Sequence, residues 1–545
     1  MTSFEEEKDV HLVVLVHGLW GNRSHMNEIR NYILSQQGSC KQKLVVHQTH
    51  LNEGYKTYDG IDVCGIRVAK EIEDEIAALG DSVVKFSLIG YSLGGLICRY
   101  ALGVLYQTQI FAKRDIELVN FITFCTPHVG VLAPGNNMAV KLFNTIVPLV
   151  LGNSGKQMFL KDKYNGFPLL YVMSLPNSVF YKALKEFKYR SLYANIINDK
   201  RTAWWTSGIS RNDPFIEINE KNGMGRFRFV EGYDPVVLDH KSPLLIAPLE
   251  EKEDSSYSEL DGNKNDDTEI DPQNYYFLNY WFGKVLRWIT FLVNLIVIAP
   301  LWFIWFILSG IMETVKSTIR AAAFARKYST YFITEVLDIS TDQSGESTDA
   351  IVDDDDEDVV EESDSDIDND GSESSSTLFE PTSSNYELHL EQSLTDQRDN
   401  LIESLLDAIE RKETRTAVVE NIKKIDEKDD NPSESKIDVT IRELELYSVE
   451  ELISKKKVHI ISDDKTATTD EDEVLKLLSN FNLNVDKLQL DIIDSLNKLK
   501  WSKFPIYIRK TPSTHAAAII RHSDPNFTEG HVVLQHFVDK VFQFA

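Results

Sequence analysis

The sequence predicts an α/β fold built on a mostly parallel sheet, and two observations support this prediction. Short runs rich in Val, Ile, Leu and Phe recur at 11–18, 43–50, 83–90 and 118–128. Such runs, apolar on both sides, are typical of strands that are buried on both faces of a sheet. Between them lie segments with helical spacing. Strands that alternate with helices indicate a parallel sheet with helices on its faces.

The elements follow in order along the chain. Residues 61–80 place apolar side chains at roughly helical spacing and end on Gly80, which predicts a helix. The Pro-, Gly- and Asn-containing stretch 133–165 is expected to form a cap region over a site. Further strands are expected at 167–175, 191–199 and 501–511, and a closing amphipathic helix at 530–544.

One serine stands between two glycines directly after the third run, in FSLIGYSLGG at 86–95. A G-x-S-x-G match alone is weak evidence. Here, however, a strand pattern precedes it and a helical pattern follows, as in the nucleophile elbow of α/β-hydrolases. Any side chain at Gly90 or Gly94 would crowd the strained turn around Ser92. The context therefore predicts an α/β-hydrolase fold with Ser92 as its nucleophile.

A second glycine-containing loop ends the first run, in VVLVHGLWGN. In this fold that loop donates one backbone N–H to the oxyanion, and the residue after the nucleophile donates the other. We therefore expect an oxyanion hole made by the backbone of Leu19 and Leu93. His17 is interpreted as a structural residue that braces the loop, and His128 as part of the site wall.

The expected chain order is Ser, then an acid, then His. Asp199 follows the strand pattern at 191–199 and is the preferred acid; Asp213 and Asp234 are rivals that follow no comparable strand. His515 follows the strand pattern near the C-terminus and is the preferred base. The alternatives are His522 and His531; His531 and His536 fall in the predicted last helix and are expected at the surface.

Five blocks together resemble the fungal serine-esterase family of α/β-hydrolases, which includes a lipid-droplet phospholipase of budding yeast and monoacylglycerol-lipase relatives. The blocks are HLVVLVHGLWGN, LIGYSLGGLICRYALGVLY, FITFCTPHVGV, YANIINDKRTAWWTSGI and SLNKLKWSKFPIYIRKTPSTHAAAIIRH. The resemblance covers roughly 10–245 and 485–545. It implies a hydrolase of glycerolipid esters, with Ser92 matching the nucleophile. No metal and no cofactor are expected.

The charge of the chain is strongly acidic, with 85 Asp and Glu against 57 Lys and Arg, a net charge of -28. This balance argues against a nucleic-acid partner, which needs a basic face. Thirteen of the 22 residues in 349–370 are acidic. A run of this kind repels itself, so we expect a disordered linker. Four cysteines without metal-site spacing and no visible secretory signal suggest a reducing compartment.

Residues 288–312 run for 25 positions without a charge, with basic residues on both flanks. A single spanning helix would separate Ser92 and Asp199 from His515, although a triad needs all three within hydrogen-bond reach. Pro300 divides the run into arms of ~18 Å, each about half of a ~30 Å hydrocarbon core. We therefore expect a hairpin in one leaflet with both ends in the cytosol. The alternative, a buried core helix, is disfavoured because polar residues are nearly absent from every face.

The predicted organisation has five parts: the main hydrolase core at 1–285, a membrane-associated hairpin with its basic flank at 286–330, an acidic linker at 338–385, a charged helical insert at 386–484, and a C-terminal part at 485–545 that completes the core. The predicted function is a serine lipase or phospholipase acting at a lipid-droplet or endoplasmic-reticulum membrane surface. A monoacylglycerol lipase or other carboxylesterase, and a catalytically silent membrane scaffold, are the alternatives.

Overall fold

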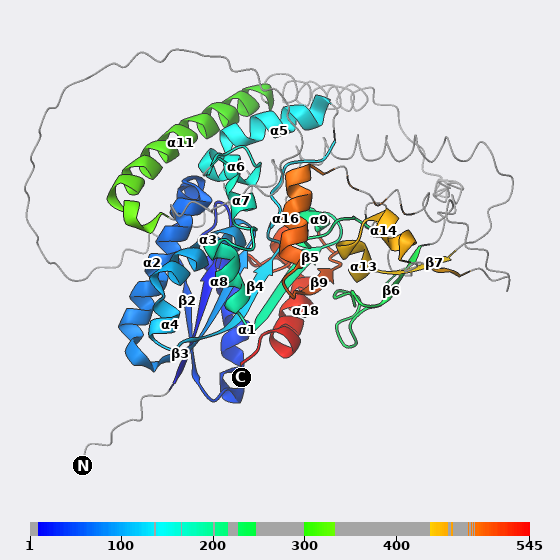
Figure 1. Ribbon diagram of the computed structural model, residues 1–545, viewed down its shortest axis with the longest axis horizontal. Coiled ribbons are helices and arrows are strands. Elements are labelled where there is room, and N and C mark those ends of the chain that lie inside the picture. Colours follow the sequence, from blue (N-terminus) through cyan, green and yellow to red (C-terminus); the bar gives the residue numbers. More distant parts are fainter. Residues whose placement is uncertain are drawn as a thin grey trace, which may run out of the picture. The chain divides into compact units, whose positions relative to one another are not determined.

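Six strands form one parallel sheet in the computed structural model (Figure 1). Their order is β2-β1-β3-β4-β5-β9, and every neighbouring pair is parallel. The mostly parallel, helix-flanked sheet predicted from the apolar runs is thus confirmed. The strands are β1 Val10–Val16, β2 Lys43–Gln48, β3 Val83–Tyr91, β4 Glu117–Phe124, β5 Tyr189–Asn195 and β9 Ser502–Ile506.

The structure describes residues 9–135, 138–164, 166–199, 202–215, 227–246, 299–332, 436–455, 459–461, 478, 481, 483 and 485–544. The acidic linker 338–385 and the first arm of the expected hairpin, 288–298, lie outside the described residues, as does most of the expected insert 386–484. A short antiparallel sheet joins β6 Pro243–Ile246, β7 Lys436–Thr440 and β8 His459–Ile461.

Helices cover the parallel sheet in two groups. Side chains of α1 (Asn27–Ser35) and α18 (Thr528–His536) share one apolar cluster with the strands. In a second layer, α3 (Leu93–Thr108) packs against both α2 (Ile61–Leu79) and α8 (Val179–Glu186). The remaining helices are α4 Ile110–Lys113, α5 Met138–Val150, α6 Gly152–Met158, α7 Leu169–Val172, α9 Trp204–Ser207, α11 Ala299–Lys327, α13 Ile441–Leu446, α14 Val449–Ser454, α16 Lys487–Asn497 and α17 Thr514–Ala517.

The C-terminal segment completes the sheet. Strand β9 pairs with β5 in parallel register from Ser191 opposite Ser502 to Asn195 opposite Ile506. Just beyond the strands, the Ile196 N–H donates to the Ile506 carbonyl at 3.0 Å. The carboxyl ends of β5 and β9 therefore lie side by side, so the loops that follow them can meet.

Helix α11 contains the second half of the uncharged run. Its described residues begin at Ala299, and Pro300 is the second of them. The expected arm ends at Met312, but the helix continues to Lys327 and includes the basic flank. Within the part of the chain that the structure describes, no helix is both long and apolar enough to cross a membrane.

Two local predictions are wrong. The segment 167–175, expected to be a strand, forms the short helix α7 instead. His536, expected at the surface, is buried, and its Nδ1 lies 2.7 Å from the Tyr193 hydroxyl. The cap region 133–165 contains α5 and α6, which lie beside α11 (Figure 1).

Candidate active site

Ser92 occupies a strained turn between β3 and α3. Its backbone angles are φ 53° and ψ −129°, in the left-handed region that side chains other than glycine rarely adopt. A Cβ added to Gly94 would lie 2.3 Å from the Val16 carbonyl oxygen, and one added to Gly90 would lie 2.5 Å from Gly95 Cα. The two glycines of the motif are therefore required by close backbone contact, as the sequence predicts.

Asp199 and His515 meet beyond the carboxyl ends of β5 and β9. His515 Nδ1 lies 2.9 Å from Asp199 Oδ2, although 316 positions separate the two residues. Both side chains are buried. The structure thus brings together the preferred acid and the preferred base. Their rivals lie elsewhere: Asp234 and His522 are exposed, and the Asp213 carboxylate accepts the Phe215 N–H.

Two further residues, which sequence reasoning missed, hold the Asp199 carboxylate. Asn195 Nδ2 donates to Oδ2 at 3.0 Å. Thr202 donates its backbone N–H to Oδ1 at 2.9 Å and its hydroxyl to Oδ2 at 3.1 Å. Asn195 ends the strand that precedes the acid and Thr202 follows the acid by three positions. These short spacings are the only signal that could have indicated them.

The pKa of Asp199 follows from these contacts. Burial raises it, but the charge and hydrogen bond of His515 and the bonds from Asn195 and Thr202 outweigh burial and lower the pKa to about 2. Asp199 is therefore ionised at neutral pH and can only accept hydrogen bonds. Because His515 Nδ1 must then be the donor, the neutral imidazole has its free lone pair on Nε2.

Tyr91 connects the elbow to His515. It directly precedes Ser92, its hydroxyl donates to the His515 carbonyl at 3.0 Å, and the two rings lie 5.0 Å apart. The backbone N–H of Ser92 itself donates to the Phe124 carbonyl at the end of β4. The serine and the histidine therefore belong to the same end of the sheet. The direct Ser92–His515 contact stays a prediction.

The loop after β1 lies against Ser92. A Cβ on Gly18 would be 2.7 Å from Ser92 Cβ and 3.3 Å from its Oγ, so the backbone next to Leu19 approaches the serine closely. Leu93 is the first residue of α3, where backbone N–H groups have no partner within the helix. Both positions suit an oxyanion hole, and the donation by Leu19 and Leu93 stays a prediction.

Both histidines considered in the first part of the sequence, His17 and His128, are buried. His17 Nδ1 lies 3.0 Å from the Gly18 carbonyl, and burial lowers the pKa of His17. His128 contacts the Thr123 hydroxyl at 2.9 Å, and burial lowers its pKa well below the usual value. Each imidazole is therefore neutral and braces a loop end.

Two groups among the described residues have metal-ligand spacing, with atoms within 4.8 Å of one another. In the first, Cys125 lies beside Asp199 and His515, but burial and the Asp199 charge raise the pKa of its thiol, which disfavours a thiolate ligand. In the second, the buried Glu71 carboxylate accepts from His47 Nε2 and from the N–H groups of His50 and Leu51. These hydrogen bonds account for the position of the Glu71 carboxylate in the second group.

Residues 6–210 match the family described as "Putative serine esterase (DUF676)". This segment, less than half of the 545 residues, is similar to that family. The resemblance noted in the sequence is thereby confirmed for the esterase segment that contains Ser92 and Asp199, whereas His515 lies outside the matched residues.

Curated relatives of the esterase segment come from yeasts. "Putative lipase ROG1" of Saccharomyces cerevisiae is 32% identical over 255 residues, 45% of this chain and 36% of that protein. "Putative lipase YDL109C" of the same species is 32% identical over 201 residues, 36% of this chain and 30% of that protein. "Putative lipase C4A8.10" of Schizosaccharomyces pombe is 27% identical, covering 47% and 32%. The matches thus span about a third of each relative's length.

Among solved structures, "Phospholipase PlaB from Legionella pneumophila" is similar at 16% identity with a TM-score of 0.23, covering 36% of this chain and 40% of that one. A similarity this low carries no argument about the esterase.

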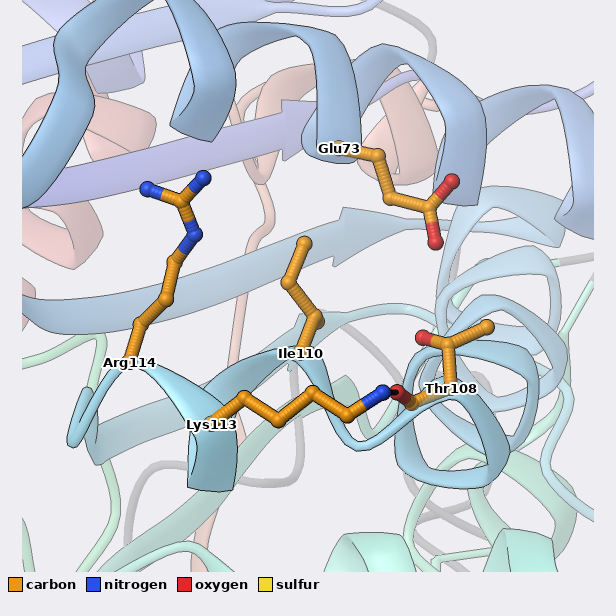
Figure 2. A pocket seen from close by; sticks show the side chains of 5 residues that line it. All are labelled: Glu73, Thr108, Ile110, Lys113 and Arg114. Atoms are coloured by element: carbon orange, nitrogen blue, oxygen red, sulfur yellow. Dashed lines mark hydrogen bonds between the residues drawn. The ribbon is translucent and has the colours of Figure 1, made fainter.

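A surface hollow of about 270 Å³ lies far from this site (Figure 2). It is lined by Glu73, Thr108, Ile110, Lys113 and Arg114. Thr108 ends α3, whose 16 residues begin directly after Ser92. At 1.5 Å per residue this places the hollow roughly 24 Å from the elbow. The Lys113 ammonium donates to the Thr108 carbonyl there, so the hollow is a feature of the α3–α4 corner and not part of the site.

Proposed function

We propose that this chain is a serine lipase or phospholipase that hydrolyses carboxylic esters of glycerophospholipids, with Ser92, His515 and Asp199 as its triad. The observation that carries the proposal is the 2.9 Å contact between His515 Nδ1 and Asp199 Oδ2, and the hydrogen bond from Tyr91, the residue before Ser92, to the His515 carbonyl supports it. Similarity to the serine-esterase family and three relatives named as lipases support the same reaction class.

In the proposed mechanism, Ser92 Oγ attacks the ester carbonyl while His515 Nε2 takes the serine proton. Ionised Asp199 stabilises the imidazolium that forms. The N–H groups of Leu93 and Leu19 stabilise the negative charge that develops on the carbonyl oxygen. The tetrahedral intermediate collapses, His515 returns the proton to the leaving alcohol, and an acyl-enzyme remains. Water, activated by His515 in the same way, then releases the fatty acid.

The lipid surface is the second part of the proposal. An uncharged run of 25 residues at 288–312 suits a hydrophobic leaflet better than water. Helix α11 supports a return of the chain to the enzyme's side, because its Arg320 pairs with Asp59 beside α2. We therefore propose a lipid-droplet or endoplasmic-reticulum membrane surface as the working location, with the catalytic part in the cytosol.

Two measurements test the reaction. A fluorophosphonate probe should label the full-length protein and fail to label Ser92→Ala; labelling that persists in the variant would exclude the assigned nucleophile. Lipid products should then be analysed on mixed glycerophospholipids and neutral glycerides. Release of fatty acid from monoacylglycerol alone would favour a monoacylglycerol lipase, and an unlabelled, inactive wild type would favour the scaffold.

A further inference from the structure

Helix α11 packs on the enzyme through its small and polar side. A Cβ on Gly310 would be 2.9 Å from Val150 Cβ, and the Thr314 hydroxyl donates to the Leu149 carbonyl at 2.9 Å. Ser317 is fully buried, and Arg320 pairs with Asp59. These residues recur every three or four positions and therefore share one face of the helix. The side of α11 that contacts α5, α6 and the rest of the enzyme is thus not its apolar side.

The opposite side of α11 carries large apolar residues in contact with solvent. Val315 is 55% exposed and Ile319 is 65% exposed. The exposed stripe occupies positions i, i+3, i+4, i+7 and i+11, which is one helical face. Its members are Leu308, Ile311, Met312, Val315 and Ile319. An amphipathic helix of a globular protein normally turns such a face inward, and α11 turns it outward.

Helix α5 repeats the pattern. Met138 is 81% exposed, Leu142 is 58% exposed and Leu149 is 51% exposed, at spacings of four and seven positions. The two helices lie side by side at one edge of the molecule (Figure 1). Together the exposed side chains of α5 and α11 form an apolar area, here called the α5–α11 face. Contiguous apolar areas on a protein surface mark sites that dock on another apolar body.

The nearby charges and the continuity with the uncharged run indicate what kind of apolar body the α5–α11 face contacts. Lys141 and Lys316 lie exposed beside the two stripes, Lys316 also pairs with Glu313 at 3.3 Å, and Arg326 and Lys327 follow at the end of α11. These basic side chains on a chain of net charge -28 complement anionic lipid headgroups. The α11 stripe is also continuous with the uncharged run 288–312, since Leu308, Ile311 and Met312 belong to both.

We propose that the α5–α11 face lies flat on a phospholipid surface with anionic headgroups and orients the enzyme on its substrate. This inference rests on the proposed function and adds the surface of contact. Basic ammonium groups at the edges of the face pair with headgroups, while the Leu, Ile, Met and Val side chains enter the upper acyl region. The contact is separate from any insertion by 288–298.

The test uses full-length protein in a Ser92→Ala background, so that lipid turnover does not affect binding. Flotation with vesicles of phosphatidylcholine, with and without phosphatidylserine, compares Leu142→Gln/Val315→Gln/Ile319→Gln with a control, Thr145→Gln/Thr318→Gln. All five positions are exposed and lie outside 288–312. The apolar triple variant should bind roughly tenfold more weakly for each side chain removed. The control should bind like its parent, and thermal unfolding should show that all three proteins are folded.

Unchanged vesicle binding by the triple variant would overturn the proposal. So would a dimer of the parent protein that the triple substitution splits while vesicle binding persists, because the face would then belong to a second copy of the chain. Lys141→Gln/Lys316→Gln should remove the gain from phosphatidylserine and retain binding to phosphatidylcholine alone. If the wild type hydrolyses no ester, the proposed function is contradicted. The vesicle-binding comparison can still be interpreted in that case.

Discussion

The Arg320 guanidinium of α11 donates hydrogen bonds to the buried Asp59 carboxylate from two of its nitrogens. Nη2 lies 2.8 Å from Oδ1 and Nε lies 3.3 Å from Oδ2. Asp59 also accepts from Arg67 Nη2 at 2.8 Å, and its side chain is fully buried. One carboxylate therefore joins the start of α2 to a helix 261 positions away. This ion-paired cluster fixes α11, and with it the end of the uncharged run, to the esterase.

Asp59→Asn should destabilise the protein by about 3 kcal/mol, because Arg67 then loses this buried carboxylate partner and Arg320 keeps only Glu313. Urea unfolding at neutral pH measures the change. The matched control is Asp81→Asn, since the Asp81 carboxylate is fully exposed in its pair with Arg114. It should leave the unfolding curve unchanged. Equal stability of Asp59→Asn and wild type would show that α11 is held by other contacts.

Asp199→Asn should lower kcat roughly 10⁴-fold with little change in KM, because the amide no longer stabilises the imidazolium or the required tautomer of His515. Steady-state hydrolysis of a short-chain ester measures this. Asp234→Asn and His522→Ala, substitutions at the rival positions, should retain activity, whereas His515→Ala should not. Full activity of His515→Ala would show that His515 is not the catalytic base.

The Asp199 pKa predicts a pH dependence of stability. It is lowered in the folded protein to about 2 from the ordinary 3.8. The ionised carboxylate therefore contributes stability that is complete above about pH 4 and is lost as the pH falls towards 2. The free energy of unfolding of Asp199→Asn should accordingly approach that of the wild type as the pH falls through this window. A difference in the free energy of unfolding between the two proteins that stays constant from pH 7 to pH 2 would contradict the lowered pKa of Asp199.

Gly94→Ala should disrupt the elbow. The new methyl group would lie 2.3 Å from the Val16 carbonyl and 2.5 Å from the His17 carbonyl, which are backbone atoms that must shift. We expect a loss of about 1–3 kcal/mol in stability together with a large loss of activity, because the loop that carries Leu19 moves. Gly38→Ala, where an added Cβ meets no atom within 4 Å, is the control. A stable and active Gly94→Ala would argue against the tight turn.

The strands of the sheet could be predicted because a parallel sheet with covered faces requires runs that are apolar on both sides. The prediction of a strand at 167–175 was wrong for the same reason: a short apolar run does not distinguish a buried helical turn from a strand. There Pro168 directly precedes α7, where it favours a helix start. The surface prediction for His536 was wrong because helical spacing does not reveal that the Tyr193 hydroxyl of β5 contacts its ring nitrogen.

Sequence reasoning selected Asp199 and His515, but it did not find the ion pairs between other distant segments. Lys503 of β9 and Glu445 of α13 form a buried ion pair at 3.2 Å, although Glu445 lies in the segment predicted as a separate charged insert. Likewise, α11 extends past Met312 because its charged residues have partners. Glu313 and Asp59 both pair with Arg320. A charge ends an apolar run in a sequence, but an ion pair allows the helix to continue.

Strand β9 follows the five other strands of the parallel sheet in chain order and is therefore synthesised after them. A nascent chain can hold Ser92 and Asp199 while the proposed proton acceptor, His515, is still untranslated, so ester cleavage has to wait until the segment that carries His515 has been made. The uncharged run emerges more than 200 positions before His515. Under the proposed mechanism, the uncharged run can therefore reach the lipid surface before the chain is able to hydrolyse an ester.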